Sequence, residues 1–132
     1  MNFAQFTNEK TILDAKAATG AGKYQDVSDY DYAIVTINTA SNSTLTVKAA
    51  GAISDTAPDM TASQSVTNRY DYLAMYDLQS GSNVAGDTGF SVSSSADHRL
   101  FRIDLKGLKW LNFIVTARTA GSVTVKIRLY HG

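Results

Sequence analysis

The stretch from Gly20 to Lys23 contains residue types that bind phosphate in many proteins. Its sequence, Gly-Ala-Gly-Lys, resembles the end of a phosphate-binding loop, in which backbone N–H groups and a lysine hold the phosphates. A complete loop needs a glycine five positions before Gly22 and a serine or threonine after the lysine. The chain has Ala17 and Tyr24 at those positions. We therefore expect an ordinary turn here and no nucleotide site.

Three carboxylates gather in the next few residues. Asp26, Asp29 and Asp31 surround Ser28, and closely spaced carboxylate oxygens are ligands that calcium prefers. The regular Asp-x-Asp-x-Asp-Gly spacing of a calcium loop is missing, and aspartate is common in turns. The sequence therefore favours a structural turn over a metal site.

Two further features are typical of hydrolases. Asp87-Thr-Gly89 has the three residues of an aspartic-protease active site, and His98 and His131 are the two histidines of the chain. An aspartic protease needs two such carboxylates close together, and this chain has one copy. Composition alone leaves a Ser-His-Asp triad open, but nothing resembles a nucleophile elbow. We expect no enzyme activity, no cofactor and no metal.

The overall charge is balanced. The 132 residues include 12 basic and 12 acidic side chains, so the formal net charge is zero, and no run of like charge occurs. Proteins that bind nucleic acid or anionic membranes depend on basic patches. The composition therefore argues against a nucleic-acid partner and against a membrane surface.

The chain contains no cysteine, which excludes a disulfide framework and a cysteine-ligated metal site. No segment approaches the ~18 consecutive apolar residues of a membrane span. The N-terminus has neither a basic region nor a long apolar stretch, so we expect no signal peptide. If the protein leaves the cell, we expect it to leave inside an assembly or by lysis.

Alternating apolar and polar residues predict strands along most of the chain, and long helical periodicity is absent. Seven or eight strands at regular spacing predict a single all-β domain over 1–132, an antiparallel β-sandwich of the Greek-key or jelly-roll type. Residues 1–9 form a candidate N-terminal arm. The expected strands are 10–16, 30–38, 44–50, 70–78, 90–92 and 98–105, with a closing hairpin within 109–130.

Two of these strands and one connection have distinctive features. The strand 30–38 is apolar on both faces, which predicts a central strand covered on both sides. The strand 70–78 places Tyr70, Tyr72 and Tyr76 on one face. Such a face would suit sugar stacking, but packing in the core or at a subunit contact is the favoured interpretation. The connection 51–69 is long, and loops of that length are usually functional or mobile.

The end of the chain predicts a β-hairpin whose turn ends at Gly121. Two runs rich in β-branched and aromatic residues flank Thr-Ala-Gly. A four-residue loop would mix apolar and polar residues on each face. A three-residue loop aligns the apolar sets and puts Gly121 where a left-handed residue is needed, so we expect this register. The residues expected to point inward are Leu111, Phe113, Val115, Val123, Val125, Ile127 and Leu129.

In that register the outward face of the hairpin places Trp110 beside Tyr130 and Ile114 beside Lys126. Tryptophan, tyrosine and arginine are the usual anchors of interfaces. Three interpretations stay open: cover by the chain's own loops or arm, a protein partner, and a small ligand or sugar. With the two phenylalanines of the arm, the expected protein interface comprises Trp110, Ile114, Lys126, Arg128, Tyr130, Phe3 and Phe6.

Several segments resemble small β-sandwich virion proteins that are encoded among the structural genes of tailed phages and prophages. The likeness covers most of the chain after residue 10 and includes no catalytic motif. The segments that carry it are Ala57-Pro-Asp59, Asn68-Arg-Tyr-Asp-Tyr72, Tyr76-Asp-Leu78, Gly86-Asp-Thr-Gly89, Gly107-Leu-Lys-Trp-Leu-Asn-Phe113 and Thr116-Ala-Arg-Thr-Ala-Gly-Ser-Val-Thr-Val-Lys126.

The resemblance implies a structural component of the phage particle, with a capsid decoration or cement protein as the best fit. It implies the major capsid protein or other virion subunits as partners, a homo-oligomer, and a place on the capsid surface after synthesis in the host cytoplasm. It supplies no functional residues to transfer. The alternative is a carbohydrate-binding β-sandwich module, for example of a head fibre or tail.

Overall fold

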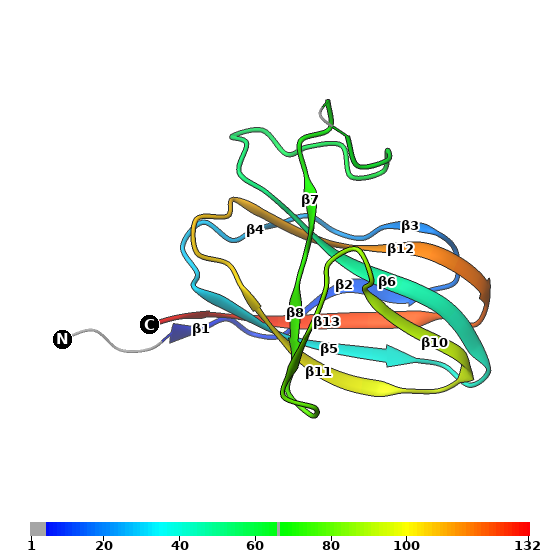
Figure 1. The fold of residues 1–132 in the computed structure, drawn as a ribbon. Helices are drawn as coiled ribbons and strands as arrows, with labels where there is room; N and C mark the ends of the chain where they lie inside the picture. Colours follow the sequence, from blue (N-terminus) through cyan, green and yellow to red (C-terminus); the bar gives the residue numbers. More distant parts are fainter. Residues whose placement is uncertain (1–4, 66) are drawn as a thin grey trace.

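The computed structural model describes residues 5–65 and 67–132, and these residues form thirteen strands and no helix (Figure 1). They accordingly include no helix that could cross a membrane. Seven strands are longer than three residues: β2 (Lys10–Lys16), β5 (Tyr32–Thr39), β6 (Ser43–Ala52), β10 (Phe90–Ser95), β11 (His98–Asp104), β12 (Trp110–Ala120) and β13 (Val123–His131). Six are shorter: β1 (Gln5–Phe6), β3 (Gly20–Ala21), β4 (Gln25–Asp26), β7 (Asp71–Leu73), β8 (Met75–Asp77) and β9 (Ser82–Val84).

The strands form two antiparallel sheets that pack face to face. Sheet A has the order β1-β13-β5-β11-β8-β9, and β2 also pairs with β13. Sheet B has the order β10-β6-β12-β3, with β4 pairing with β12 and β7 with β6. The prediction of an all-β antiparallel sandwich is confirmed. The expected number of strands was too low, because strands of two or three residues are too short to show an alternating pattern.

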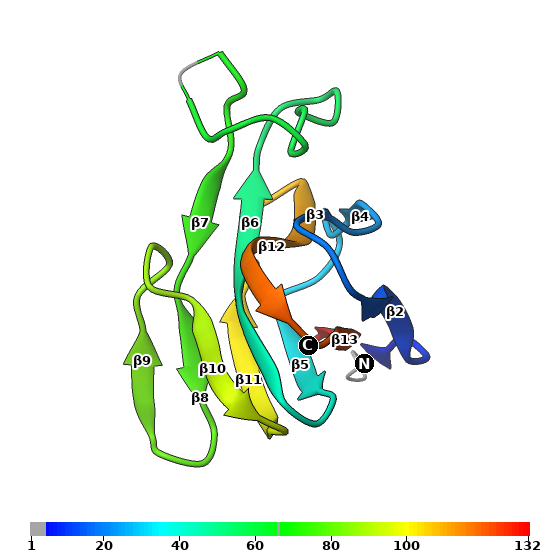
Figure 2. The ribbon, with the colours of Figure 1, turned by 90° about the vertical axis from the view of Figure 1, so that its right-hand side faces the viewer.

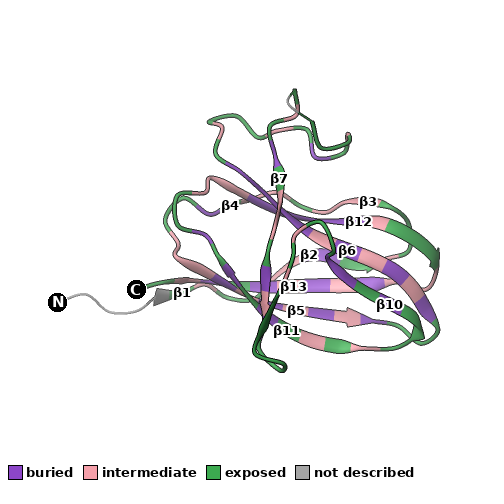
Figure 3. Cartoon of the chain, viewed as in Figure 1, coloured by how far each residue is buried: buried purple, intermediate pink, exposed green. Residues whose placement is uncertain are grey.

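The core lies between the sheets and consists of the inward residues of each long strand. Along β5 and β13, buried residues alternate with partly exposed ones, a period of two that Figure 3 makes visible. On β5, Ala33, Val35 and Ile37 are fully buried, while the outward residues are half-buried. The predicted central position of this strand is confirmed, since it lies between β13 and β11. The expectation that its second face is also covered was wrong.

One segment passes from one sheet to the other. β7 pairs with β6 in sheet B, β8 pairs with β11 in sheet A, and Ala74 alone separates them. Figures 1 and 2 show the two strands as one continuous run. The strand predicted over 70–78 is therefore divided, and so is its row of tyrosines. Tyr70 and Tyr72 pack on the sheet B side, whereas Tyr76 lies on sheet A.

The closing hairpin is the main correction to the sequence analysis. β12 pairs with β6, β3 and β4, and β13 pairs with β5, β1 and β2, so the two strands belong to different sheets. Figure 1 shows them in separate layers, joined at one end. The expected inward residues do enter one core cluster. They meet across the sandwich and not along a shared ladder.

Gly121 lies at the connection between these two strands, with a φ of +82°. The left-handed conformation expected at this position is confirmed. A Cβ on Gly121 would lie 2.5 Å from the Cα of Ser43, which is fully buried at the start of β6. The Ser43 hydroxyl donates to the Ala40 carbonyl at 2.6 Å and accepts from the Ser122 N–H at 3.3 Å. The chain thus crosses between the sheets in a space too narrow for a residue with a Cβ atom.

Part of the outer face of sheet B is covered by the segment 53–70. Met60 and Tyr70 are buried against Ala50, Ala52 and Ile114. The Trp110 indole N–H donates to the Ser54 carbonyl at 2.9 Å. For Trp110 and Ile114, the structure therefore favours the first of the three interpretations of the outward face, cover by the chain's own loop.

Candidate functional site

Five side chains form a row across the outer face of sheet A, one from each of five adjacent strands. We call this set the ring row: Phe6 of β1, Tyr130 of β13, Tyr32 of β5, Arg102 of β11 and Tyr76 of β8. The strand registers align three of the steps, since Phe6 pairs with Tyr130, Tyr130 with Tyr32, and Arg102 with Tyr76. At the step from β5 to β11, Arg102 pairs with Ile34, so Arg102 and Tyr32 are diagonal neighbours. Four steps between strands, each about 4.8 Å, give the row a length of about 19 Å.

The rings of the row contact one another and the guanidinium. The Phe6 and Tyr130 centroids are 4.8 Å apart, and the Tyr130 and Tyr32 rings are stacked at 6.2 Å. The Arg102 guanidinium lies 5.9 Å from the Tyr32 centroid and 4.8 Å from the Tyr76 centroid. Arg102 therefore lies over two tyrosines, a cation–π arrangement that restricts its side chain.

Backbone and side-chain bonds fix the Phe6 end of the row. The Thr7 N–H donates to the Leu129 carbonyl at 2.9 Å, and the Leu129 N–H donates to the Thr7 hydroxyl at 3.0 Å. The described part of the expected N-terminal arm thus continues sheet A along the edge of β13. Phe6 is 60% exposed. A large apolar side chain is therefore presented to solvent from a backbone that is held in place.

Two further cations flank the row. The Arg128 guanidinium lies 5.6 Å from the Phe6 centroid, and the Lys106 ammonium lies 5.6 Å from the Tyr32 centroid. Beside the rings is an open groove of about 460 Å³. The lining residues are Phe6, Tyr32, Ile34, Arg102 and Tyr130.

The acidic groups near this face are few. Lys126 forms an ion pair with Glu9 at 3.3 Å. Asp104, which pairs with Tyr32 across the strands, accepts from the Lys106 backbone N–H at 3.1 Å. The ion pairs found among the described residues involve none of Arg102, Arg128 and Lys106. The face therefore has an excess of positive charge.

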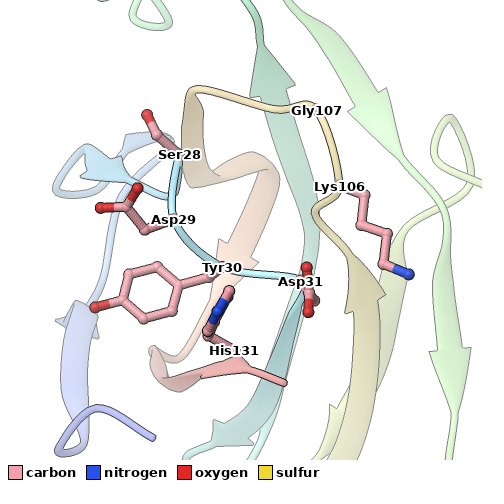
Figure 4. Close-up of a pocket in the computed structure, with 7 residues that line it drawn as sticks. All are labelled: Ser28, Asp29, Tyr30, Asp31, Lys106, Gly107 and His131. Atoms are coloured by element: carbon pink, nitrogen blue, oxygen red, sulfur yellow. The ribbon is translucent and has the colours of Figure 1, made fainter. Parts of the chain in front are cut away.

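A second, polar pocket of about 600 Å³ lies next to the row. Its lining residues are Ser28, Asp29, Tyr30, Asp31, Lys106, Gly107 and His131. Figure 4 shows the Tyr30 and His131 rings side by side, while Asp29 and Lys106 point to opposite sides. The Asp31 carboxylate accepts from the Gly132 N–H at 3.2 Å. These side chains do not converge on one point, as a catalytic or metal centre would require.

The acidic turn that sequence analysis singled out forms polar contacts within the chain. Asp26 accepts from the Lys109 ammonium at 2.8 Å and from the Ser28 N–H at 3.0 Å. The bond from Lys109, followed by those from Ser28, holds the pKa of the Asp26 carboxyl well below its usual range. In the parts of the chain that the structure describes, no three His, Cys, Asp or Glu side chains are placed to hold a metal ion.

The phosphate-loop candidate forms part of β3. Gly20 and Ala21 pair with Val115 and Ile114 of β12, and the Gly22 N–H donates to the Phe113 carbonyl at 2.9 Å. These backbone groups are therefore used within sheet B. At the other candidate, the Thr88 and Gly89 N–H groups both donate to the Ala85 carbonyl at 3.0 Å. The turn expected at Asp87–Gly89 is confirmed, whereas the turn expected at Gly20–Lys23 is in part an edge strand, β3.

The structure divides the expected interface residues between the two outer faces. Trp110 and Ile114 lie on sheet B, and Lys126, Arg128 and Tyr130 lie on sheet A. The structure brings Phe6 beside Tyr130 and Arg128. Phe3 lies outside the described residues. The seven residues therefore do not form one surface, and a role for each of them in an interface stays a prediction.

Sequence analysis missed Tyr32, Arg102 and Tyr76 as members of one surface. Each stands at an outward position of its strand, which the alternating pattern does indicate. Which strands are neighbours, however, depends on pairing between segments far apart in the chain, such as β5 with β11. An aromatic row across strands has no signature within any single strand.

Comparison with known proteins finds solved structures of similar fold. No family model matches the chain, and no curated protein matches it significantly. Among solved structures, the SPBc2 prophage-derived protein YomS has a TM-score of 0.70 at 17% identity, and the match covers 98% of this chain and 96% of that one. The PBSX exported protein XepA has a TM-score of 0.72 at 12% identity, covering 98% of this chain and 39% of that one. The chain thus has the β-sandwich fold of prophage proteins.

Proposed function

We propose that this protein is a structural subunit of a phage particle. The observation that carries the proposal is the fold likeness to the prophage-derived protein YomS, which extends over 98% of this chain and 96% of the other. The likeness therefore concerns the whole sandwich and not a small shared module. The finer role that we propose is capsid decoration or cement, on the capsid surface of the virion.

The ring row supplies a surface suited to such a role. Aromatic residues and arginine are enriched at protein interfaces, and lysine and glutamate are depleted there. The row combines Phe6, three tyrosines and Arg102, next to an apolar groove. We propose that this face docks on the major capsid protein or on another virion subunit. Copies of the chain form a closed, symmetric homo-oligomer in this proposal, as most soluble oligomers do.

Purified particles test the proposal. Particles of the phage or induced prophage that encodes the chain are separated from free protein by density gradient and analysed by mass spectrometry. We expect peptides of this chain to follow the major capsid protein through the gradient in a constant ratio. Tailless heads from a tail-assembly mutant show whether the chain belongs to the capsid. If the chain is abundant in the lysate and absent from the particles, the proposal fails.

A carbohydrate-binding module is the second candidate function. The observation in its favour is the line of rings on an open face, because sugar rings stack on aromatic side chains. Trp110 lies on the opposite sheet, so its fluorescence would not report binding at the row. Tyrosine ring signals in NMR spectra would report it. A glycan array without hits, together with unchanged tyrosine signals in the presence of sugars, would remove this candidate.

A further inference from the structure

The cations of the ring row are placed to bind an anion. Arg102 lies over the faces of Tyr32 and Tyr76, and a guanidinium stacked in this way still has N–H edges that pair with a carboxylate in a bidentate manner. Among the described residues, no side-chain hydrogen bond or ion pair engages the Arg102 guanidinium. Its strongest donors are therefore available to a partner.

Arg128 and Lys106 extend this positive charge along the row. Arg128 donates through Nε to the Thr7 carbonyl at 3.2 Å, a neutral acceptor that leaves its charge uncompensated. Asp104 is the carboxylate that pairs across the strands with Tyr32, and Glu9 is already paired with Lys126. Asp31 lines the neighbouring pocket with Lys106 and forms no ion pair among the described residues. Three cations thus face two carboxylates without an ion pair, Asp104 and Asp31. Because the whole chain is neutral, this excess is local, and it calls for a negatively charged partner.

The apolar part of the face indicates which anionic partner fits. Phe6 is 60% exposed, Leu100 is 39% exposed, and Ile34 lines the groove between Tyr32 and Arg102. A polysaccharide presents hydroxyl groups, which need polar partners to compensate for lost water. Apolar side chains of a polypeptide have no such requirement. The combination of rings, arginine and aliphatic residues is typical of a protein interface.

We infer that the ring row binds an acidic segment of a partner protein, in which aspartate or glutamate side chains pair with Arg102, Arg128 and Lys106 while apolar side chains enter the groove. A row of about 19 Å accommodates about six residues of extended chain. This inference rests on the proposed function for the identity of the partner as a virion subunit. The pairing of acidic side chains with the three cations does not depend on the proposed function.

The first test uses synthetic peptides and ¹⁵N-labelled protein. The probe is a peptide of about eight residues in which glutamate alternates with leucine, long enough to span the row. The same peptide with lysine in place of glutamate is the control for charge. We expect the acidic peptide to bind with signal changes confined to β1, β13, β5, β11 and β8, and binding to weaken as salt is raised. We expect no such changes with the basic peptide.

Matched variants then identify the contact. Arg102→Gln removes the charge and keeps a polar side chain of similar length, and we expect about a tenfold loss of affinity or more, the scale of a charge-assisted bond. Arg69→Gln changes an exposed arginine in the 53–70 segment and should leave affinity unchanged. An amide spectrum of each variant confirms that the fold is intact. Equal losses in both variants would overturn the inference.

Polygalacturonate and polyphosphate serve as anionic polymers without side chains. Absence of binding by the acidic peptide, or binding at the row by either polymer but not by the peptide, would overturn the inference in favour of another occupant. Failure of the particle experiment would remove the proposed function and leave peptide recognition standing. Peptide recognition can equally fail while the chain is still found in particles, so the two results are distinguishable.

Discussion

Gly121 illustrates how one residue determines the path of the chain. The connection between β12 and β13 has to cross from sheet B to sheet A beside the buried Ser43. A positive φ of +82° turns the backbone, and the missing Cβ lets it pass the start of β6. Conformation and packing therefore both require glycine here, for separate reasons.

Replacement of Gly121 by alanine tests whether both requirements matter. We expect a loss of about 2–4 kcal/mol in the free energy of unfolding, because a strained φ and an overlap with Ser43 act together. Gly107→Ala is the matched control, since Gly107 has a φ of +88° and a Cβ added there would meet no atom within 4 Å. It should cost roughly 1 kcal/mol, from conformation alone. Urea unfolding of both variants measures the difference, and equal losses would contradict the packing argument.

At the scale of elements, three aromatic side chains bind the backbone of the segment 53–70, and two of them come from outside the segment. The Trp110 indole donates to the Ser54 carbonyl at 2.9 Å, and the Tyr70 hydroxyl donates to the Ala62 carbonyl at 2.6 Å. The Tyr24 hydroxyl accepts from the Met60 N–H at 2.7 Å. A segment without regular strands is thus anchored by Trp110 and Tyr24, while Tyr70, which belongs to the segment, forms a bond within it.

Trp110→Phe removes one anchor and keeps an aromatic ring. We expect faster amide hydrogen exchange over 53–65 and a loss of about 1 kcal/mol in the free energy of unfolding, the usual scale of one hydrogen bond. Tyr30→Phe, which alters a ring packed against the main core and not against the segment 53–70, should leave exchange over 53–65 unchanged. Weakened self-association without faster exchange would instead assign Trp110 to an interface.

The strands also show how much of the fold could be predicted from the sequence alone. Alternation identified the inward residues of β12 and β13, because a period of two assigns each side chain to a face. It could not tell whether the two strands pair or face each other across the core, since both arrangements bury the same residues. A glycine with positive φ suits a hairpin turn and a crossing between sheets equally well. The same limit concealed the ring row, which depends on five strands being neighbours.

At the scale of the whole molecule, three carboxylates make stability depend on pH. The Lys109 bond, then Ser28, lowers the pKa of Asp26, and bonds from Thr61 lower that of Asp59. At Asp77, burial alone would raise the pKa, but the N–H groups of Gln79 and Ser80 and the charge of Arg99 outweigh it and lower it. The three groups lie in separate parts of the sandwich, so they act on the global unfolding equilibrium.

A carboxyl whose pKa is lower in the folded protein than in the unfolded chain stabilises the fold when ionised. That contribution is complete above the unfolded value of about 3.9 and is lost as the pH falls through the folded value. We expect the urea midpoint to decrease steadily from about pH 5 to about pH 2. Asp77→Asn should flatten part of this decrease, whereas Asp14→Asn, an exposed site on β2, should have little effect on its slope. An unchanged slope in Asp77→Asn would contradict the assignment.

The two outer faces of the sandwich differ in how far the chain's own loops cover them. On sheet B the segment 53–70 covers Ile114, Ala50 and Ala52, so part of that face belongs to the chain's own core. On sheet A the ring row and its cations remain open. The docking surface that we propose therefore lies on the open face, opposite the covered one.

The edges of sheet A limit how copies of the chain can meet. β9 at one edge has three residues, and β2 at the other departs from regular pairing twice along β13, with Ala15 at a positive φ of 45°. Short and bulged edges offer few consecutive free N–H and C=O groups to a foreign strand. Crowding of many copies, as on a particle, would then not extend sheet A from one copy into the next. Contacts between copies at these edges would then depend on side chains and not on backbone hydrogen bonds.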